Sequence, residues 1–560
     1  MSALFRPSML MLLILMVGQS VLPAIAQEDQ QENSASSRIQ RINELVEAVW
    51  LDYDLKPSQQ ASDGEWCRRL YLDLLGRIPT VDELDAFVGS GDKQKREQLV
   101  NTLLNDDEYT GEFARNWTTI WTNLLIGRTG GNDNNSLISR RGLQKFLRDS
   151  FARNKAFDKF ADELVTATGT TEPGAEDFNG AVNFLIDKVN PEKGTQATAV
   201  TSRLFLGLQV QCTQCHNHPF NDWKQQKYLE MNAFFRQTKA FRGGMRRADD
   251  GPARLADQDF RGEGRGGNYE KPPIFYEMRN GEMRVAYPVF IDGTEIEPSG
   301  YVNVVNRREE FARLMLNSEY FPKAIANRMW AHFLGYGFTA PVDDLGPHNP
   351  ATNPELLGFL GEEFRDTGFD LRQLIAWIVL SKPYGLSSKV GKQNKSDDPL
   401  LGESPKFSRF YLRQMRAEEL YESLQVATRA GQSQQNFDEQ ERLKNRWLQQ
   451  FSSAFGTDEG DETTSFNGTI PQVLMMFNGE MIRNATSGRD NMIKQLSTNS
   501  KMPYKQQVTY LFKSGLSRRP KRTELQMANE FLNIYDGDSY QSLQDVWWVI
   551  LNSNEFIFNH

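Results

Sequence analysis

Two cysteines and a histidine lie together in the segment Cys212-Thr213-Gln214-Cys215-His216. The chain has 560 residues but only three cysteines and five histidines, so such a concentration is unusual. Cys-x-x-Cys-His is the attachment pattern of c-type haem, in which both thiols bond to the haem vinyl groups and the adjacent imidazole becomes the proximal iron ligand. The spacing therefore predicts haem c held by Cys212, Cys215 and His216.

Two other interpretations of this segment stay open. Cys212, Cys215, His216 and His218 could supply four nitrogen or sulfur ligands to zinc or another divalent metal. Against this, structural zinc sites usually draw on two separated ligand pairs, and four ligands so close in sequence leave little slack for a tetrahedron. The thiols could also form a structural pair or a disulfide without any cofactor. His218 lies too near His216 to reach the opposite haem face, so a sixth iron ligand would have to come from elsewhere.

A second group of candidate residues follows in the C-terminal half. It comprises Arg328, His332, Asp343, Asp344 and His348. Residues four apart in a helix share a face, so Arg328 and His332 can point the same way. Adjacent aspartates with a histidine could bind a cation or carry out acid–base catalysis. The pattern favours the other interpretation, in which a buried salt-bridge network fixes a helix to a loop.

The elements beside the cysteine motif are expected to be helices. Apolar residues at helical spacing predict a helix over about 196–210 that leads into the motif. Another is expected over 223–235, where Asp222 can cap its start and Pro219 interrupts the chain before it. Met231 and Met245 are the options nearest in sequence for a sixth iron ligand.

Residues 1–26 have the pattern of a secretory signal peptide. Arg6 gives the positive start, an apolar run follows, and Ala24-Ile25-Ala26 is a small-x-small cleavage site. An uncleaved anchor is the alternative, and no other segment resembles a membrane span. The pattern predicts an exported protein of the periplasm, the cell envelope or the secreted fraction. Export agrees with the haem interpretation, because covalent haem attachment also happens after export.

Composition excludes some classes of protein. A net charge of -9 argues against nucleic acid as a partner. Aromatic residues make up 11% of the chain, which indicates packed globular domains rather than disorder. The third cysteine, Cys67, lies in an apolar helical pattern and is expected to be a small buried side chain.

The apolar periodicity predicts a mainly α fold with two helical domains. After a flexible leader at 27–37, the first domain spans 38–240 and the second 301–560, joined by a Gly/Arg-rich loop and a small β-hairpin within 241–300. Asn280-Gly281 is the expected hairpin turn, within 272–293. The remaining expected helices lie at 94–105, 108–126, 141–152, 155–167, 308–316, 322–334, 354–366, 370–381, 413–428, 504–515, 520–534 and 542–553, with a loop at 388–404, one helical patch in 431–465 and a turn plus helix at 468–478.

One short pattern occurs twice, far apart in the chain. Leu75–Pro79 followed by Glu83 matches Leu516–Pro520 followed by Glu524. The first copy predicts a helix end at Gly76 and a capping box from Thr80 to Glu83. Downstream of the copies, Leu104–Tyr109 resembles Leu551–Phe556, and a third version stands at Leu316–Tyr320. These matches suggest a duplicated helix–turn–helix unit, although recurring capping chemistry would give a similar pattern.

The motifs also resemble two known families. Trp66–Thr80 and Leu206–Phe220 resemble the planctomycete cytochrome-associated domain of unknown function, DUF1549 (PSCyt2). The usual C-terminal companion of that domain, DUF1553 (PSD1), is similar to the second half of this chain at Asn327–Phe333, Pro341–Asp344, Pro354–Leu357 and Leu551–Phe556.

The resemblance covers nearly the whole mature chain, and the motifs come in the family order. One departure is Asn217, where the family pattern has Asp. The resemblance implies an exported planctomycete-type protein whose family has no established activity, and its association with cytochromes implies redox chemistry. We therefore expect a haem-binding electron-transfer protein with a redox or envelope partner. The alternative is a non-redox envelope protein that binds or processes polysaccharide, in which the Cys/His cluster is structural.

Overall fold

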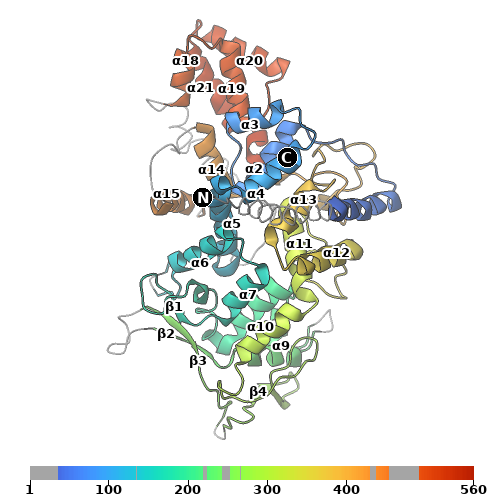
Figure 1. Ribbon diagram of the computed structural model, residues 1–560, viewed down its shortest axis with the longest axis vertical. Helices are drawn as coiled ribbons and strands as arrows, with labels where there is room; N and C mark the ends of the chain where they lie inside the picture. The colour runs from blue at the N-terminus through green and yellow to red at the C-terminus, as the bar shows by residue number, and fades with distance from the viewer. Residues whose placement is uncertain are drawn as a thin grey trace, which may run out of the picture.

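The computed structural model describes residues 36–133, 135–218, 223–242, 252–264, 267–428, 437–452 and 491–560. The expected signal peptide, Pro219, Asp222, Met245 and the helix at 468–478 lie outside the described residues. Within them the fold is mainly α, as the periodicity predicts. Figure 1 shows α18 to α21 at one end of the molecule, the small strands β1 to β4 near the other end, and most longer helices between them.

The helices follow the predicted periodic segments closely. The first spans residues 36–52. Those of the N-terminal half are α2 (Asp63–Leu75), α3 (Val81–Gly89), α4 (Lys95–Asn105), α5 (Asp107–Ile126), α6 (Arg140–Ala152), α7 (Phe157–Thr166), α8 (Thr195–Thr201) and α9 (Gln225–Asn232). Those that follow are α10 (Arg307–Asn317), α11 (Tyr320–Leu334), α12 (Pro354–Asp366), α13 (Leu371–Leu380), α14 (Ala417–Thr428), α15 (Phe437–Ser452), α18 (Met492–Thr498), α19 (Tyr504–Leu516), α20 (Arg522–Ile534), α21 (Ser539–Leu551) and α22 (Asn554–Ile557).

The strands form three small antiparallel sheets. The predicted hairpin is confirmed as β4 (Ile274–Glu277) paired with β5 (Met283–Ala286). The other strands are β1 (Gly169–Thr170), β2 (Thr238–Phe241) and β3 (Arg254–Asp257) in the order β1-β3-β2, and β6 (Arg413–Gln414) paired with β7 (Phe558–Asn559). Because β3 lies inside 241–300, that stretch is not only a loop and a hairpin. This strand was not predicted because it has only four residues and pairs with distant segments, so its sequence pattern is too short to detect.

The two copies of the repeated pattern adopt the same local structure. Gly76 after α2 and Ser517 after α19 are both left-handed, with φ of 73° and 54°. Arg77 then pairs with Glu83, and its Nη1 and Nη2 donate to the carboxylate at 2.9 Å. The capping box from Thr80 to Glu83 is confirmed.

In the second copy, Arg518 donates to Glu524 at 2.8 and 2.7 Å. Each arginine also binds a second glutamate, Glu112 for Arg77 and Glu555 for Arg518. The sequence match paired Glu555 with Glu108, so the first copy takes its second carboxylate one helical turn later. We call these the first and second arginine clamps. Their shared geometry supports a duplicated unit.

The hydrophobic core does not divide at the boundaries drawn from sequence. One cluster of buried side chains runs from Ile42 to Tyr411 and so includes both sides of 241–300. A second cluster is built from Met415 to Phe556 and takes in Leu72 and Ile78 from the N-terminal part. The predicted domain limits therefore divide the sequence but not the hydrophobic core. The C-terminal helices pack on α2.

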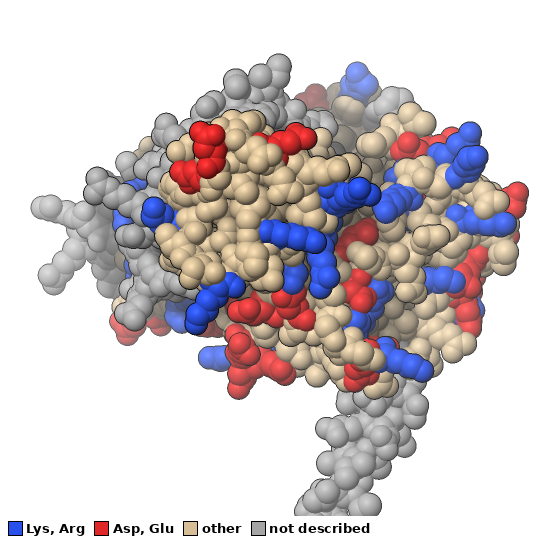
Figure 2. All heavy atoms as spheres, turned by 90° about the horizontal axis from the view of Figure 1, so that it is seen from above, with Lys and Arg blue, Asp and Glu red and all other residues tan. Residues whose placement is uncertain are grey.

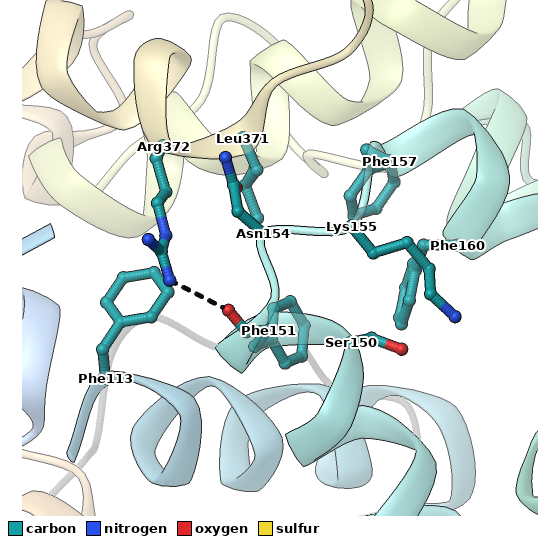
Figure 3. A pocket seen from close by; sticks show the side chains of 9 residues that line it. All are labelled: Phe113, Ser150, Phe151, Asn154, Lys155, Phe157, Phe160, Leu371 and Arg372. Carbon is teal, nitrogen blue, oxygen red and sulfur yellow. Dashed lines mark hydrogen bonds between the residues drawn. The ribbon is translucent and has the colours of Figure 1, made fainter. Parts of the chain in front are cut away.

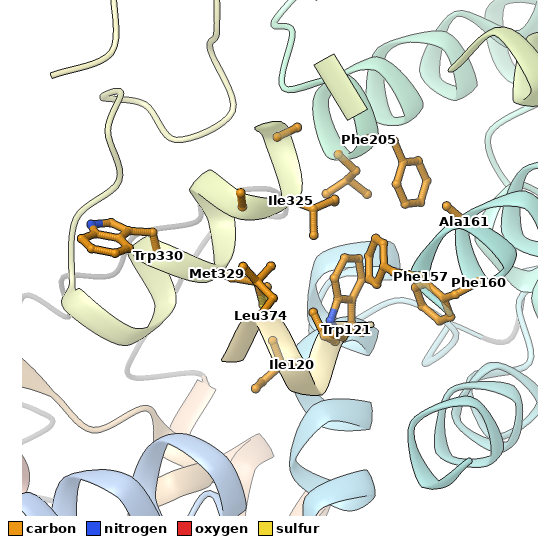
Figure 4. Close-up of a cluster of buried hydrophobic side chains, with 14 of the residues drawn as sticks. Ile120, Trp121, Phe157, Phe160, Ala161, Phe205, Ile325, Met329, Trp330 and Leu374 are labelled. Carbon is orange, nitrogen blue, oxygen red and sulfur yellow. The ribbon is translucent and has the colours of Figure 1, made fainter. Parts of the chain in front are cut away.

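Figure 4 shows the centre of the larger cluster, where α5, α7, α11 and α13 meet. Trp121 is fully buried, and its ring lies 5.2 Å from Phe157 and 5.4 Å from Phe160 between centroids. Burying each such side chain contributes about 1.5–3 kcal/mol. The ring of Phe157 also lies 6.2 Å from that of Phe321 in α11, the helix that carries part of the second candidate group.

The surface carries charges of both signs. In the view of Figure 2, from the end that holds α18 to α21, basic and acidic side chains are interleaved over the described residues. No helix of the described residues is long and apolar enough to span a membrane.

Candidate functional site

The approach to the cysteine motif is a tight turn after α8. The helix is shorter than predicted, because it passes into one π turn at Ser202–Leu206 and stops at Gly207, with φ of 64°. The positive φ favours glycine here, and a Cβ at Gly207 would lie 2.9 Å from Cδ1 of Leu345, which would have to move. The backbone N of Leu345 donates to the carbonyl of Gly207 at 2.7 Å. The loop after α11 therefore fixes where the motif begins.

The motif itself is a surface turn that displays both thiols. Gln211–Gln214 forms a single 3₁₀ turn, with Cys215 directly after it. Cys212 and Cys215 are exposed and not joined in a disulfide. Residues three apart in a 3₁₀ helix lie on one side, so both thiols share a face. Thr213 points inward instead, where its hydroxyl donates to the carbonyl of Val210 at 2.6 Å.

His216 has one ring nitrogen engaged and the other directed away from that contact. Its Nδ1 lies 2.7 Å from the carbonyl oxygen of Asn217. Because a carbonyl only accepts, Nδ1 carries the hydrogen in this contact, and Nε2 of the neutral ring keeps its lone pair. Metal-binding histidines commonly have this arrangement, with one nitrogen on the metal and the other donating to a backbone carbonyl.

The residues after the motif are held by α9 and the hairpin. The side-chain oxygen of Asn217 accepts from the backbone N of Gln225 at 3.0 Å. The Gln225 side chain reaches the carbonyl of Glu277 in β4 at 3.3 Å. The backbone N of His218 donates to the carbonyl of Trp223 at 2.8 Å. Asn217, the one departure from the family pattern, thus serves as the anchor of the chain beyond His216.

The second candidate group meets the first through Asp343. This buried carboxylate accepts from Nε2 of Gln209 at 2.7 Å, and Nε of Arg203 lies 3.7 Å away. Gln209 stands three residues before Cys212 in the sequence. Burial lowers the pKa of Arg328 to about 10, and the carboxylate of Asp343 opposes that change. Asp343 therefore ties the segment leading to the motif to the loop after α11.

The other members of the second group lie in separate surroundings. Asp344 and His348 form their own pair on the loop, with 2.9 Å between Oδ1 and Nε2. His332 lies between α2 and α5 instead: its Nε2 is 3.5 Å from the carbonyl oxygen of Asp73, and its ring packs 5.2 Å from Trp117. Burial lowers the pKa of His332 to about 3, so the ring is neutral near pH 7. The structure does not gather these residues into one catalytic arrangement.

The described residues contain no preformed metal site that would support the zinc interpretation. No group of three or more His, Cys, Asp or Glu side chains is arranged there to hold a metal ion. Met231, an option for a sixth iron ligand, is fully buried in the core, and Met245 lies outside the described residues. The donor set of Cys212, Cys215 and His216 does fit haem attachment, because both thiols are free and exposed at one short turn and Nδ1, not Nε2, of His216 contacts the backbone carbonyl.

Sequence reasoning missed a buried polar centre built around Asp73. Its carboxylate accepts from the hydroxyl of Tyr384 at 2.8 Å, from the Asn559 amide at 2.7 Å and from Arg413. The carboxylate is fully buried, and its partners come from distant parts of the chain. We call this set the Asp73 centre. The available signal was the series Arg68, Arg69 and Asp73 inside an otherwise apolar helix, because buried charges require partners.

A small aromatic hollow lies between α5, α6, α7 and α13. Figure 3 shows it lined by Phe113, Phe151, Phe157 and Phe160, with Arg372 donating to the carbonyl of Phe151 at 3.2 Å. Its volume of about 10 Å³ is room for one water molecule at most. This hollow is a packing defect rather than a ligand site.

Comparison with known families finds the two families that the sequence resembles. Residues 41–240 match the family PSCyt2, described as a protein of unknown function (DUF1549). Residues 307–464 match PSD1, described as a protein of unknown function (DUF1553). No curated protein and no solved structure matches the chain. The chain belongs to the proteins that combine a DUF1549 domain with a DUF1553 domain.

The contact at Asp343 joins the two family domains. Gln209 and the cysteine motif lie within the DUF1549 match, whereas Asp343 lies within the DUF1553 match. The hydrogen bond between Gln209 and Asp343 therefore crosses from one family domain to the other. Because the two domains meet beside the motif, the second domain helps to position it.

Proposed function

We propose that this chain is an exported c-type haem protein that transfers electrons, with haem attached at the cysteine motif. The observation that carries the proposal is the turn at Gln211–Gln214, beside which two free, exposed thiols lie directly before a histidine. Cys212 and Cys215 would hold the haem through thioether bonds, and Nε2 of His216 would ligate its iron. When bound, haem supplies one-electron redox chemistry.

The protein's own part is to hold these three side chains in place. The carbonyl of Asn217 keeps the His216 ring in the tautomer that leaves Nε2 able to bind. Gly207 and Gln225 fix the chain before and after the turn, through Leu345 and Asn217. A site on the surface suits exchange of electrons with a partner, because it needs no substrate channel. Export is a prediction from residues 1–26, which the structure does not describe.

The experiment is to produce the full chain in a host that attaches haem to exported proteins. A haem stain that survives a denaturing gel and a Soret absorbance band are expected for the native sequence. Replacing Cys212 and Cys215 by alanine removes the stain. The matched control is Cys67→Ala, which deletes the buried cysteine and leaves the stain unchanged. His216→Ala retains the covalent bonds but changes the absorbance of the haem, because the proximal ligand is lost.

Two results would contradict the proposal. One is a colourless chain from a host that correctly matures a known c-type cytochrome in parallel. The other is bound zinc, with stoichiometry that depends on Cys212 and Cys215. In that case the cysteine variants lower the free energy of unfolding, because metal binding and folding are coupled.

A further inference from the structure

A groove lined by basic side chains lies between α6 and α15. Its volume is about 690 Å³. Figure 1 shows the two helices as neighbours at one side of the molecule. Six cationic side chains line it: Arg140, Arg141, Lys145, Arg148, Arg442 and Arg446. In a chain whose net charge is -9, a groove with this excess of positive charge needs an explanation.

The cations stand in two rows because of helical spacing. On α6, Arg141, Lys145 and Arg148 follow at intervals of four and three, which places them on one face with about 5–6 Å between neighbouring Cβ atoms. On α15, Arg442 and Arg446 repeat the interval of four. The groove therefore presents positive charge at regular intervals along both walls. Such a series matches a ligand with repeated anionic groups better than a single small anion.

Two acidic side chains of the described residues lie beside these rows, Glu441 and Asp149. Glu441 is the one acidic residue among those that line the groove, and it already binds Arg115 at 2.9 Å and lies 3.8 Å from Lys444. Lys145 has a partner in Asp149 at 3.0 Å, but that pair is exposed, so its ions remain hydrated and exchangeable. Arg140 is the innermost cation and is fixed by the carbonyls of Gly127 and Gly130, at 3.0 and 3.1 Å.

We propose that this groove binds an acidic polysaccharide, with its sulfate or carboxylate groups against the two rows of cations. The amides of Gln144 and Asn445 also line the groove and suit the hydroxyl groups of sugars. Single-stranded nucleic acid is the less suitable polyanion, because proteins bind it by stacking bases on aromatic rings. The described residues lining this groove include no aromatic side chain. The proposal is independent of haem attachment.

The test uses dextran sulfate as the probe and uncharged dextran of the same length as its reference. Arg141→Glu with Arg446→Glu removes one cation from each row. The matched control is Lys501→Glu with Lys505→Glu, which makes the same change in net charge on exposed residues away from the groove. The native chain should bind dextran sulfate and not dextran, with an affinity that falls as salt rises. The groove variant should bind at least about tenfold more weakly, and the control within about twofold of native.

Thermal unfolding of both variants shows whether each is folded before binding is compared. Equal loss of affinity in the groove variant and the control would overturn the proposal, because it would show only the effect of total charge. Absence of dextran sulfate binding at low salt would overturn it too. Single-stranded DNA is the third probe. If it binds as tightly as dextran sulfate and depends on the same two arginines, the groove is a nucleic-acid site and the proposal fails.

Discussion

The cysteine motif and the Asp73 centre are both rich in polar side chains, yet the fold treats them in opposite ways. The carboxylate of Asp73 is buried and bound by three buried side chains, Tyr384, Arg413 and Asn559. At the motif, both thiols face solvent on a short turn. Buried ionic groups are fixed by their partners and serve the fold, whereas exposed nucleophiles remain open to chemistry. The difference separates the structural site from the chemical one.

The strongest way to test this contrast is Asp73→Ala. Removing one member of a buried, hydrogen-bonded ion pair leaves Arg413 uncompensated, so we expect the free energy of unfolding to fall by about 3–5 kcal/mol. Denaturant unfolding measures the change. Cys215→Ala is the comparison and should cost less than about 0.5 kcal/mol in the haem-free chain, because the side chain is exposed. Equal losses in both variants would remove the distinction.

The arginine clamps refine the contrast, because they differ in burial. The side chains of Arg77 and Glu83 are 10% and 17% exposed, whereas Arg518 and Glu524 are both 23% exposed. Arg77→Met should therefore lower the free energy of unfolding by about 2 kcal/mol and Arg518→Met by about 1 kcal/mol. Urea unfolding of both variants measures this order. A larger loss from Arg518→Met would show that burial does not determine how much each clamp contributes to the free energy of unfolding.

The buried ring of His332 makes the stability of the folded chain depend on pH. Its pKa is lowered by burial and by Arg416, with Glu419 opposing them. The unfolded chain therefore binds a proton below about pH 6.5 that the folded chain takes up only near pH 3, and stability falls as pH decreases through this window. The loss should be about 1.4 kcal/mol at pH 5.5.

Unfolding at pH 7 and pH 5.5 tests this prediction in the native chain and in His332→Gln. The variant lacks the titrating ring, so its stability should change less between the two values. His348→Gln is the control, because it removes a histidine from the loop after α11 rather than from the core. An unchanged pH dependence in His332→Gln would contradict a neutral buried ring.

A smaller effect is expected at Asp343, which links the two family domains of the chain. Asp343→Ala leaves the amide of Gln209 without its acceptor and should cost about 1 kcal/mol. It should also lower the fraction of chains that acquire haem, because the segment before Cys212 loses its support. Haem content per protein measures this. Asp344→Ala is the matched neighbour on the same loop and should leave haem content unchanged.

Local patterns predicted much of the fold, and contacts across the chain explain the remainder. The α5 helix was expected over 108–126 and spans Asp107–Ile126, because its periodicity is complete within one segment. The sequence also located the hairpin and the Cys-x-x-Cys-His turn. The sheet through β3 and the Asp73 centre could not be predicted, because they join residues separated by much of the chain. For the same reason, the bond from Asp343 to Gln209 was not visible in the sequence.

The most direct test of haem attachment is the intact mass of the denatured chain. The protein is produced in a host that attaches haem to exported proteins, then unfolded and freed of non-covalent ligands. We predict a mass increase of one haem in the native chain and none in the variant that lacks Cys212 and Cys215. An unmodified mass for the native chain, alongside complete modification of a c-type cytochrome matured in the same cells, would contradict the account.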